Sequence, residues 1–334
     1  MADTIFRSYF KENEPGGAIL VLRENKVVYS NAIGLADINT NEKISTKTLF
    51  NLGSISKPIV AYGILKLAED RKLSLDDNLL KYFPDFRNKD IAKKIKLYHL
   101  LTHTSGLPDS RRVSEEHEFY LTAKDEENFA PLLMTDTLEF EPGSRYKYSN
   151  PAFNGLALII EKVSGEKWQD YVRKHILVPA GMMTSTITDG PHPETGVSHA
   201  YVRLKDGGFA EMDYGEEPTF AAAGNGGVWS SVEELWLLEQ AIQQNKFLST
   251  EWLDRSRTRY SLPNWADKDQ SRLGLSWFIT IEMSKEMIGH TGSQGGFISD
   301  YVWIPELQVF YVLLCNTPKP IIELRQKMLN ALLR

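Results

Sequence analysis

Strand-like sequence occurs at both ends of this 334-residue chain, and helical sequence fills the region between them. Residues 16–37 contain two β-rich runs on either side of Glu24-Asn25, a pattern typical of a hairpin. Strand-like runs return near the C-terminus, at residues 273–281, 295–305 and 307–315. Because both ends of the chain are strand-like, we expect them to contribute strands to a single sheet.

Helical periodicity is strongest in three segments of the middle region, residues 59–72, 150–165 and 230–244. Gly165 is placed to end the second of these helices, and Ser231 with Glu234 forms a capping box for the third. The chain closes in an amphipathic helix with Ile321, Leu324, Met328 and Leu332 on one face.

The order of these segments predicts a discontinuous architecture. We expect residues 1–60 and 210–334 to form an α/β sheet domain, and residues 61–209 to form an inserted, mostly helical domain. A cleft is expected where the two domains meet. The active site should lie at this interface.

Composition excludes several classes of protein. The net charge is −6 without a block of Lys or Arg, so nucleic acid is not an expected partner. The one cysteine, Cys315, excludes an intramolecular disulfide and lies in an apolar run, which predicts a buried thiol. The seven histidines lack zinc-binding spacing, so neither a metal nor a cofactor is predicted.

The sequence leaves two cellular compartments open. No apolar run reaches the roughly 18–20 residues that span a bilayer, and the N-terminal residues lack the apolar stretch of a signal peptide. The protein is therefore expected to be cytoplasmic as written, or periplasmic or extracellular if a signal peptide has been removed. The sequence carries no signal for an oligomeric state.

The search for a nucleophile leads to Ser54. The chain contains no G-x-S-x-G motif, but four S-x-x-K motifs begin at Ser8, Ser54, Ser144 and Ser164. Only Ser54 stands where an extended segment meets a long apolar helix, whose N-terminal N–H groups favour an alkoxide and an oxyanion. Pro58 removes a helical N–H, so the entrance of this helix is expected to be distorted. A plain helix cap at Ser54 with a solvated Lys57 is the alternative.

The tripeptide Tyr-Ser-Asn occurs twice, at residues 29–31 and 148–150, and His290-Thr291-Gly292 follows near the C-terminus. The order S-x-x-K, then Y-x-N, then H-T-G resembles the serine β-lactamase and penicillin-binding-protein superfamily, in its class C-like branch. That branch includes D-alanyl-D-alanine carboxypeptidases, D-aminopeptidases and esterases. The resemblance covers nearly the whole chain. It implies an α/β (α+β), β-lactamase/transpeptidase-like fold, an antiparallel sheet flanked by N- and C-terminal helices with the helical domain inserted.

The resemblance also assigns roles to residues. It implies that Ser54, Lys57 and Tyr148 are catalytic, and that Asn150 holds the substrate amide and orients Lys57. His290, Thr291, Gly292 and Ser293 are expected to bind substrate, with the N–H groups of Ser54 and Ser293 forming an oxyanion hole. Asn150 as a helix cap and Ser293 as a plain strand residue are the alternatives.

The remaining tyrosine and histidine candidates are expected to be structural. Tyr29 precedes the nucleophile and should be a packing residue of a strand. His103 should lie in a structural turn, because Lys57 and Tyr148 already supply a base. Free Tyr and Lys have pKa values near 10 and 10.4, so one must fall by about three units to act near neutral pH. The two titrate as a pair, and the sequence leaves open which one is the base.

His290 stands where β-lactamases carry a lysine, and this difference bears on the substrate. A histidine near pKa 6.5 is mostly neutral and gives a substrate carboxylate no permanent cation. We therefore expect a serine hydrolase that forms a Ser54 acyl-enzyme on a small amide or peptide with a D-residue, or on an ester. A β-lactamase, an acyl transferase and a non-catalytic binding or assembly protein of the same fold are the alternatives.

Overall fold

A computed structural model of the chain describes residues 1–112, 115–116, 123–188, 196–212, 224–266 and 272–333. Its centre is a six-stranded antiparallel sheet with the strand order β10-β11-β12-β13-β1-β2. The strands are β1 (Gly17–Arg23), β2 (Lys26–Ile33), β10 (Phe278–Glu282), β11 (Lys285–Gln294), β12 (Phe297–Ile304) and β13 (Val309–Cys315). Because β1 pairs with β13, both ends of the chain enter one sheet, as the sequence predicts.

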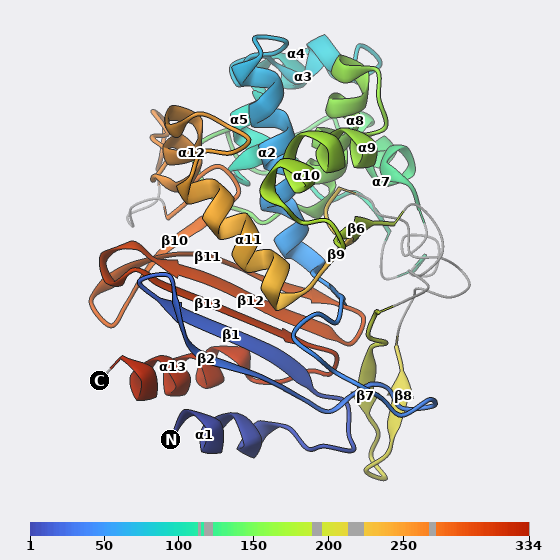
Figure 1. The fold of residues 1–334 in the computed structure, drawn as a ribbon. Helices are drawn as coiled ribbons and strands as arrows, with labels where there is room; N and C mark the ends of the chain where they lie inside the picture. Colours follow the sequence, from blue (N-terminus) through green and yellow to red (C-terminus); the bar gives the residue numbers. More distant parts are fainter. Residues whose placement is uncertain (113–114, 117–122, 189–195, 213–223, 267–271, 334) are drawn as a thin grey trace.

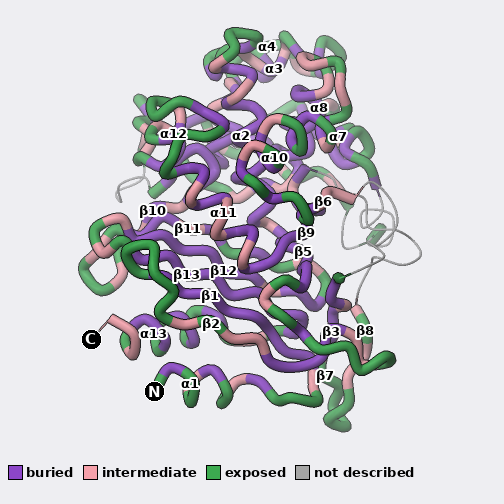
Figure 2. The backbone as a smooth tube through the Cα atoms, in the orientation of Figure 1, coloured by how far each residue is buried: buried purple, intermediate pink, exposed green. Residues whose placement is uncertain are grey.

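The sheet is covered on both faces (Figure 1). Helices α1 (Ala2–Tyr9) and α13 (Ile321–Leu332) lie on one face, and α11 (Val232–Gln243) lies on the other. Every residue of β13 is buried, Cys315 included, as Figure 2 shows for the centre of the sheet. A strand with two covered faces has no polar side, which explains the continuous apolar run 309–315.

The middle of the chain is helical and surrounds α2 (Ser56–Glu69), which is buried along nearly its whole length. The other helices of this region are α3 (Leu79–Tyr82), α4 (Lys89–Lys94), α5 (Leu97–Leu101), α7 (Asp125–Leu133), α8 (Asn150–Ser164), α9 (Trp168–Val172), α10 (Val178–Ala180) and α12 (Thr250–Arg257). A 3₁₀ turn, η1 (Gly53–Ile55), precedes α2, η2 (Arg173–Leu177) is a π-helical turn, and η3 (Pro305–Leu307) joins β12 to β13.

Short strands complete the fold in three small sheets. They are β3 (Leu35–Asp37) with β4 (Glu42–Lys43), β7 (Tyr201–Arg203) with β8 (Phe209–Glu211), and β5 (Phe50–Asn51), β9 (Val228–Ser230) and β6 (Thr186–Ile187) in the third. Pairing of β5 with β9 attaches the segment before η1 to the segment before α11. The limits of the inserted domain, residues 61–209, stay a prediction.

Local signals in the sequence correspond to the observed turns and helix ends. Glu24 and Asn25 both have positive φ, 51° and 61°, as a tight hairpin turn requires. Gly165 ends α8 with φ 74°, a conformation that costs other residues about 1 kcal/mol or more. At the start of α11, the Ser231 hydroxyl accepts a hydrogen bond from the Glu234 N–H at 3.2 Å. The turn at Glu24-Asn25, the end of α8 at Gly165 and the helix cap at Ser231 are confirmed. The reciprocal half of the capping box is not, because the Glu234 carboxylate accepts hydrogen bonds from Thr184 and Ser185 instead.

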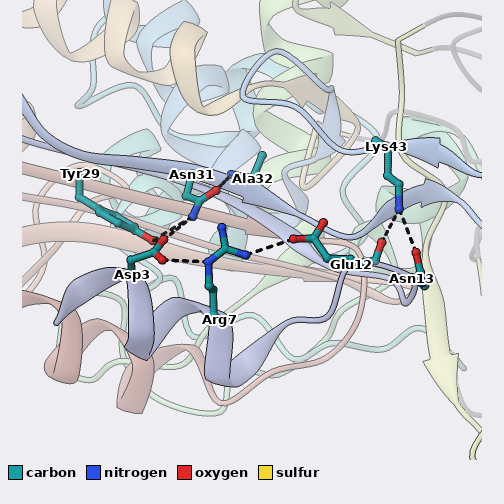
Figure 3. Close-up of polar contacts among 8 residues, drawn as sticks. All are labelled: Asp3, Arg7, Glu12, Asn13, Tyr29, Asn31, Ala32 and Lys43. Carbon is teal, nitrogen blue, oxygen red and sulfur yellow. Dashed lines mark hydrogen bonds and ion pairs between the residues drawn. The ribbon is translucent and has the colours of Figure 1, made fainter.

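The first Tyr-Ser-Asn segment attaches α1 to the sheet (Figure 3). Asp3 Oδ1 accepts hydrogen bonds from the Tyr29 hydroxyl at 3.1 Å and from Asn31 Nδ2 at 2.8 Å. The Tyr29 ring also packs edge-on against Phe6, with 6.1 Å between ring centroids. Tyr29 is therefore a packing residue of β2, as predicted.

Candidate active site

Ser54 lies in the 3₁₀ turn η1, immediately before the buried helix α2. The distance from its Oγ to Lys57 Nζ is 3.0 Å, a hydrogen bond that the one-turn spacing of S-x-x-K makes possible. The turn agrees with the distortion expected from Pro58, and α2 begins at Ser56. The other S-x-x-K serines differ: the Ser8 hydroxyl, for example, donates to the Ile5 carbonyl of its own helix at 2.6 Å.

Lys57 is fully buried, with 0% of its surface exposed. Its Nζ donates to Ser54 Oγ and, at 2.7 Å, to the main-chain carbonyl of Asn225. Burial lowers the pKa of Lys57 well below its usual value, and the positive charge of Arg111 lowers it further. A neutral amine beside the serine is therefore favoured, and a neutral amine can accept a proton.

Tyr148 lies over the same lysine, with 5.0 Å from Lys57 Nζ to the centre of its ring. Burial raises the pKa of Tyr148 above its usual value, and the nearby Ser54 hydroxyl opposes this rise only in part. Its buried hydroxyl has no hydrogen-bond partner among the described residues. Tyr148 is therefore a neutral phenol that can donate a proton to an incoming group.

The ring of His103 packs against the ring of Tyr148, a contact that the sequence did not indicate. Its ring stacks on Tyr148 with 4.3 Å between ring centroids. Its Nδ1 accepts a hydrogen bond from the Ser149 N–H at 3.1 Å, and φ of 55° places it in a tight turn. Burial lowers the pKa of His103 well below its usual value. The geometry agrees with a structural turn and not with a base.

Strand β11 approaches Ser54 so closely that two glycines are required. A Cβ atom at Gly53 would lie 2.7 Å from the Ser293 nitrogen, and one at Gly292 would lie 2.0 Å from the Leu52 oxygen. The Ser299 hydroxyl of β12 donates to the same Leu52 oxygen at 2.8 Å. These contacts place the main chain of Ser293 against the turn that carries Ser54.

The half of β11 that faces this turn has an edge with which no described strand pairs. Pairing with β10 extends only as far as Gly289, opposite Phe278, so β10 leaves His290–Gln294 uncovered. Main-chain N–H and C=O groups on such an edge can bind an extended ligand.

His290 lies on this edge but is only 4% exposed. Its Nδ1 donates to the Thr291 carbonyl at 2.6 Å, which leaves Nε2 as an acceptor in the neutral ring. Burial lowers the pKa of His290 to about 3. The ring is therefore neutral well below the pH that an ordinary histidine would require.

A cleft of about 510 Å³ lies beside Ser54, Tyr148 and β11, and Lys57 and His103 are not among the described residues that line it. It is lined by six of the predicted site residues, Ser54, Tyr148, His290, Thr291, Gly292 and Ser293. It is also lined by residues that sequence reasoning missed, Tyr146, Phe278, Ile298, Lys319, Ile321 and Ile322. The missed residues carry no motif and come from four separate parts of the chain, so only the tertiary structure could identify them.

Asn150 is the first residue of α8, directly after the helix cap Ser149. It is partly exposed and is not among the described residues that line the cleft. The described hydrogen bonds of Lys57 Nζ go to Ser54 and Asn225. A role for Asn150 in holding the substrate amide and orienting Lys57 stays a prediction.

Comparison with known proteins agrees with this geometry. A family model with the description Beta-lactamase matches residues 2–332. The chain belongs to the beta-lactamase family. It has the β-lactamase/transpeptidase-like fold that the sequence predicts.

Two curated proteins illustrate the range of the beta-lactamase family. A penicillin-binding protein of Bacillus subtilis is 27% identical over 310 residues, which are 88% of this chain and 66% of the relative. Esterase EstB of Burkholderia gladioli is 27% identical over 353 residues, which are 94% of this chain and 89% of the esterase. The chain thus spans just under two thirds of the length of the first relative.

Solved structures share the fold. An octameric penicillin-binding protein homologue from Pyrococcus abyssi matches with a TM-score of 0.81 and 26% identity, over 96% of this chain and 74% of the other. D-amino acid amidase from Ochrobactrum anthropi SV3 matches with a TM-score of 0.78 and 20% identity, over 99% and 98%. Within the described residues of the present chain, no helix is both long and apolar enough to cross a membrane.

Proposed function

We propose that this protein is a serine hydrolase that forms an acyl-enzyme at Ser54 on a small amide or peptide with a D-residue, or on an ester. The observation that carries the proposal is the 3.0 Å hydrogen bond between Ser54 Oγ and the fully buried Lys57 amine. A buried neutral amine in contact with a hydroxyl is the arrangement that an activated serine nucleophile requires.

During acylation, Lys57 would accept a proton and Tyr148 would donate one. Lys57 Nζ takes the proton of the Ser54 hydroxyl while Oγ attacks the substrate carbonyl carbon. The carbonyl oxygen becomes an oxyanion, for which the N–H groups of Ser54 and Ser293 are the proposed donors. As the C–N or C–O bond breaks, the Tyr148 phenol donates its proton to the leaving group, and the Lys57 ammonium returns a proton to Tyr148. Lys57 is then neutral again.

Deacylation would repeat the same steps with water in place of serine. Lys57 accepts a proton from the attacking water, the bond between the acyl carbon and Oγ breaks, and the Lys57 ammonium returns the proton to Oγ, so that the acid is released and Lys57 is neutral again. The positions of Ser293 and Gly292 against the Ser54 turn support a shared oxyanion site for both steps.

The proposed substrate class rests on His290 and on the relatives. An uncharged His290 supplies an acceptor and no cation, which disfavours dedicated β-lactam hydrolysis. The beta-lactamase family includes a named esterase and, among its structural neighbours, a named D-amino acid amidase. An intact hydrogen bond from Lys57 to Ser54 favours a catalyst over a non-catalytic protein of this fold.

A labelling experiment tests the nucleophile. A fluorophosphonate probe should add one covalent mass to the peptide that contains Ser54, and Ser54→Ala should abolish it. Ser164→Ala is the matched control, because Ser164 begins another S-x-x-K motif and bonds to Glu166 of its own segment. Labelling that survives Ser54→Ala would refute the assignment.

A panel of substrates then tests the class. One preparation should be assayed with D-amino-acid amides, D-Ala-D-Ala peptides, p-nitrophenyl esters and nitrocefin. We expect turnover of an amide, peptide or ester that exceeds turnover of nitrocefin and disappears in Ser54→Ala. Nitrocefin as the best substrate would favour the β-lactamase alternative.

A further inference from the structure

Among the described residues that line the cleft, one cation makes no ion pair with a described residue. Of the described residues that line it, only His290 and Lys319 have side chains that can carry a positive charge at moderate pH. His290 is buried and neutral, with Nδ1 bonded to the Thr291 carbonyl. A negatively charged part of a substrate would therefore find its cation at Lys319.

Lys319 is half-buried and makes no described ion pair. Its Nζ lies 5.3 Å from the centre of the Phe10 ring, a contact that leaves its hydrogen-bond donors free for a ligand. Glu14, whose negative charge acts on Lys319, is paired instead with Lys11 at 2.8 Å. Burial lowers the pKa of Lys319, as expected for a cation that is partly desolvated without a carboxylate beside it.

The sheet register places Lys319 near the Ser293 end of the β11 edge that β10 leaves uncovered, His290–Gln294. Ser293 pairs with Ile298 of β12, and Ile298 pairs with Cys315, the last residue of β13. Lys319 follows four residues later, in the connection that leads into α13. The chain thus carries this lysine past the end of β11, away from the His290 end.

The wall beside Lys319 is apolar. Ile298 of β12 and Ile321 and Ile322 of α13 line the same cleft. Ile322 is 42% exposed, although burial of such a side chain would be favourable. An apolar wall that ends in a cation suits a ligand with an apolar segment that ends in an anion.

We propose that Lys319 is a specificity-determining residue that anchors the carboxylate of a substrate whose apolar segment lies on Ile298, Ile321 and Ile322. The inference deepens the proposed function and rests on it, since it names the substrates that the Ser54 site favours. They are D-residue peptides or esters that end in a carboxylate, and neutral analogues of the same length should be poorer substrates.

Matched peptides test this anchor. The series is acetyl-D-phenylalanyl-D-alanine and its forms lengthened by one or two D-alanines, each with a terminal carboxylate or a terminal carboxamide. For a peptide of at least one of these lengths, the wild-type kcat/KM should be about tenfold higher for the carboxylate form than for the carboxamide form, mainly because KM is lower. A factor of this size is expected from one half-exposed contact between opposite charges. Lys319→Met should reduce this preference to about one, because the variant keeps the apolar stem and loses the charge.

Two further variants serve as controls. Lys319→Arg keeps the charge and should keep the preference. Lys327→Met removes an exposed lysine of α13 that pairs with Glu323, outside the cleft, and should also keep it. A wild type without preference at any length, or a preference that survives Lys319→Met, would overturn the proposal.

Binding separates this inference from the proposed function. Dissociation constants of the same peptides should be measured calorimetrically on the Ser54→Ala protein with Lys319 or Met at position 319. If wild type hydrolyses none of the peptides, the proposed hydrolase activity is refuted. If the peptides still bind with a preference for the carboxylate form that depends on Lys319, the role of Lys319 as the carboxylate anchor is supported. Hydrolysis of both peptide forms at equal rates, with equal binding, would refute only the anchor.

Discussion

Burial has opposite effects on the pKa values of the two proton-transferring residues of the site. Because it disfavours the charged form, it lowers the pKa of the Lys57 amine and raises that of the Tyr148 phenol. In the unliganded protein, Lys57 can therefore accept a proton and Tyr148 can donate one. Sequence reasoning left the base open, and these directions favour Lys57.

The twin Tyr-Ser-Asn segments allow a matched pair of substitutions. Tyr148→Phe removes the phenol that lies over Lys57, so kcat should fall by about 10² or more, the scale for loss of a general acid. Tyr29→Phe removes a hydrogen bond to Asp3 on the far face of the sheet and should leave kcat nearly unchanged. Steady-state kinetics on one ester would check both, and similar losses in the two variants would contradict the assignment.

The depressed pKa of Lys57 predicts the shape of the pH profile. Catalysis requires the neutral amine, so kcat/KM for a neutral ester should rise with pH and level off well below 10.5, the usual value for lysine. The profile should be recorded in well-buffered solutions from pH 5 to 11, with Ser54→Ala as the blank. A rise that continues through pH 10.5 would show that Lys57 is an ordinary, charged lysine in the free enzyme.

The neutral state of His290 predicts a change of substrate preference. With a pKa of about 3, His290 stays uncharged from pH 5 to 8, so acidification in this range should not improve nitrocefin hydrolysis. His290→Lys should raise acylation by nitrocefin relative to a neutral p-nitrophenyl ester, because a charge-assisted hydrogen bond contributes roughly 1.5–3 kcal/mol. Equal changes for the two substrates would mean that the reactivity of Ser54 had changed instead.

Among the elements, α13 is attached to the sheet by a buried ionic group. Arg325 donates to Asp300 of β12 and to Glu282 of β10, each at 2.7 Å. Asp300 is fully buried, and burial raises its pKa to about 6 although Arg325 opposes the rise. Loss of Arg325 would leave a buried carboxylate with no described cation.

This arrangement predicts a pH-dependent stability. Arg325→Met should destabilise the fold by about 3–5 kcal/mol at pH 8, as expected when one partner of a buried pair is removed. A raised pKa means that the folded state binds the proton more tightly, so stability from Asp300 is lost as pH rises from about 4 through about 6. The deficit of Arg325→Met should therefore shrink at pH 5, as measured by urea unfolding.

An exposed lysine of the same helix provides the control. Lys327→Met removes a charge that pairs only with surface groups of α1 and α13, and it should leave the urea midpoint nearly unchanged at both pH values. A deficit of Arg325→Met that is equal at pH 5 and pH 8 would show that lost packing, and not the stranded carboxylate, causes it.

At the scale of the whole molecule, the site depends on the close approach of the sheet to the buried helix α2. Gly53 and Gly292 lie at this contact, and Gly53 has a positive φ of 52° as well. Gly165 shares the positive φ, at 74°, but a Cβ added there would meet no described atom within 4 Å beyond its chain neighbours and its own helix backbone. A comparison of Gly53 with Gly165 therefore distinguishes the effect of close packing from the effect of backbone strain.

Alanine substitutions at these two glycines should differ in kind. Gly165→Ala should cost about 1 kcal/mol of stability through backbone strain and leave kcat unchanged. Gly53→Ala adds a collision with Ser293, so it should cost more stability and lower kcat, because the turn and β11 must separate. Thermal unfolding and ester kinetics on both variants would check this, and normal kcat in folded Gly53→Ala would contradict it.

The sequence determined by itself what depends on neighbours along the chain. The period of apolar residues predicted the strands at both ends and the helices between them, and the hairpin turn at Glu24-Asn25 and the end of α8 at Gly165 followed from local backbone preferences. Ser54 stood out from the other three S-x-x-K serines by its place before a long apolar helix. Tyr29 could be set apart from Tyr148 by its place in a predicted strand.

Only the tertiary structure decided what depends on burial and on contacts between distant segments. The lowered pKa values of Lys57 and His290 follow from their burial. The stacking of His103 on Tyr148 and the pairing of Arg325 with Asp300 join residues that are far apart in the chain. Lys319 came to the cleft in the same way, without any motif. The physical reason is that local propensity acts over a few residues, whereas desolvation and charge act through space, where the fold alone sets the distances.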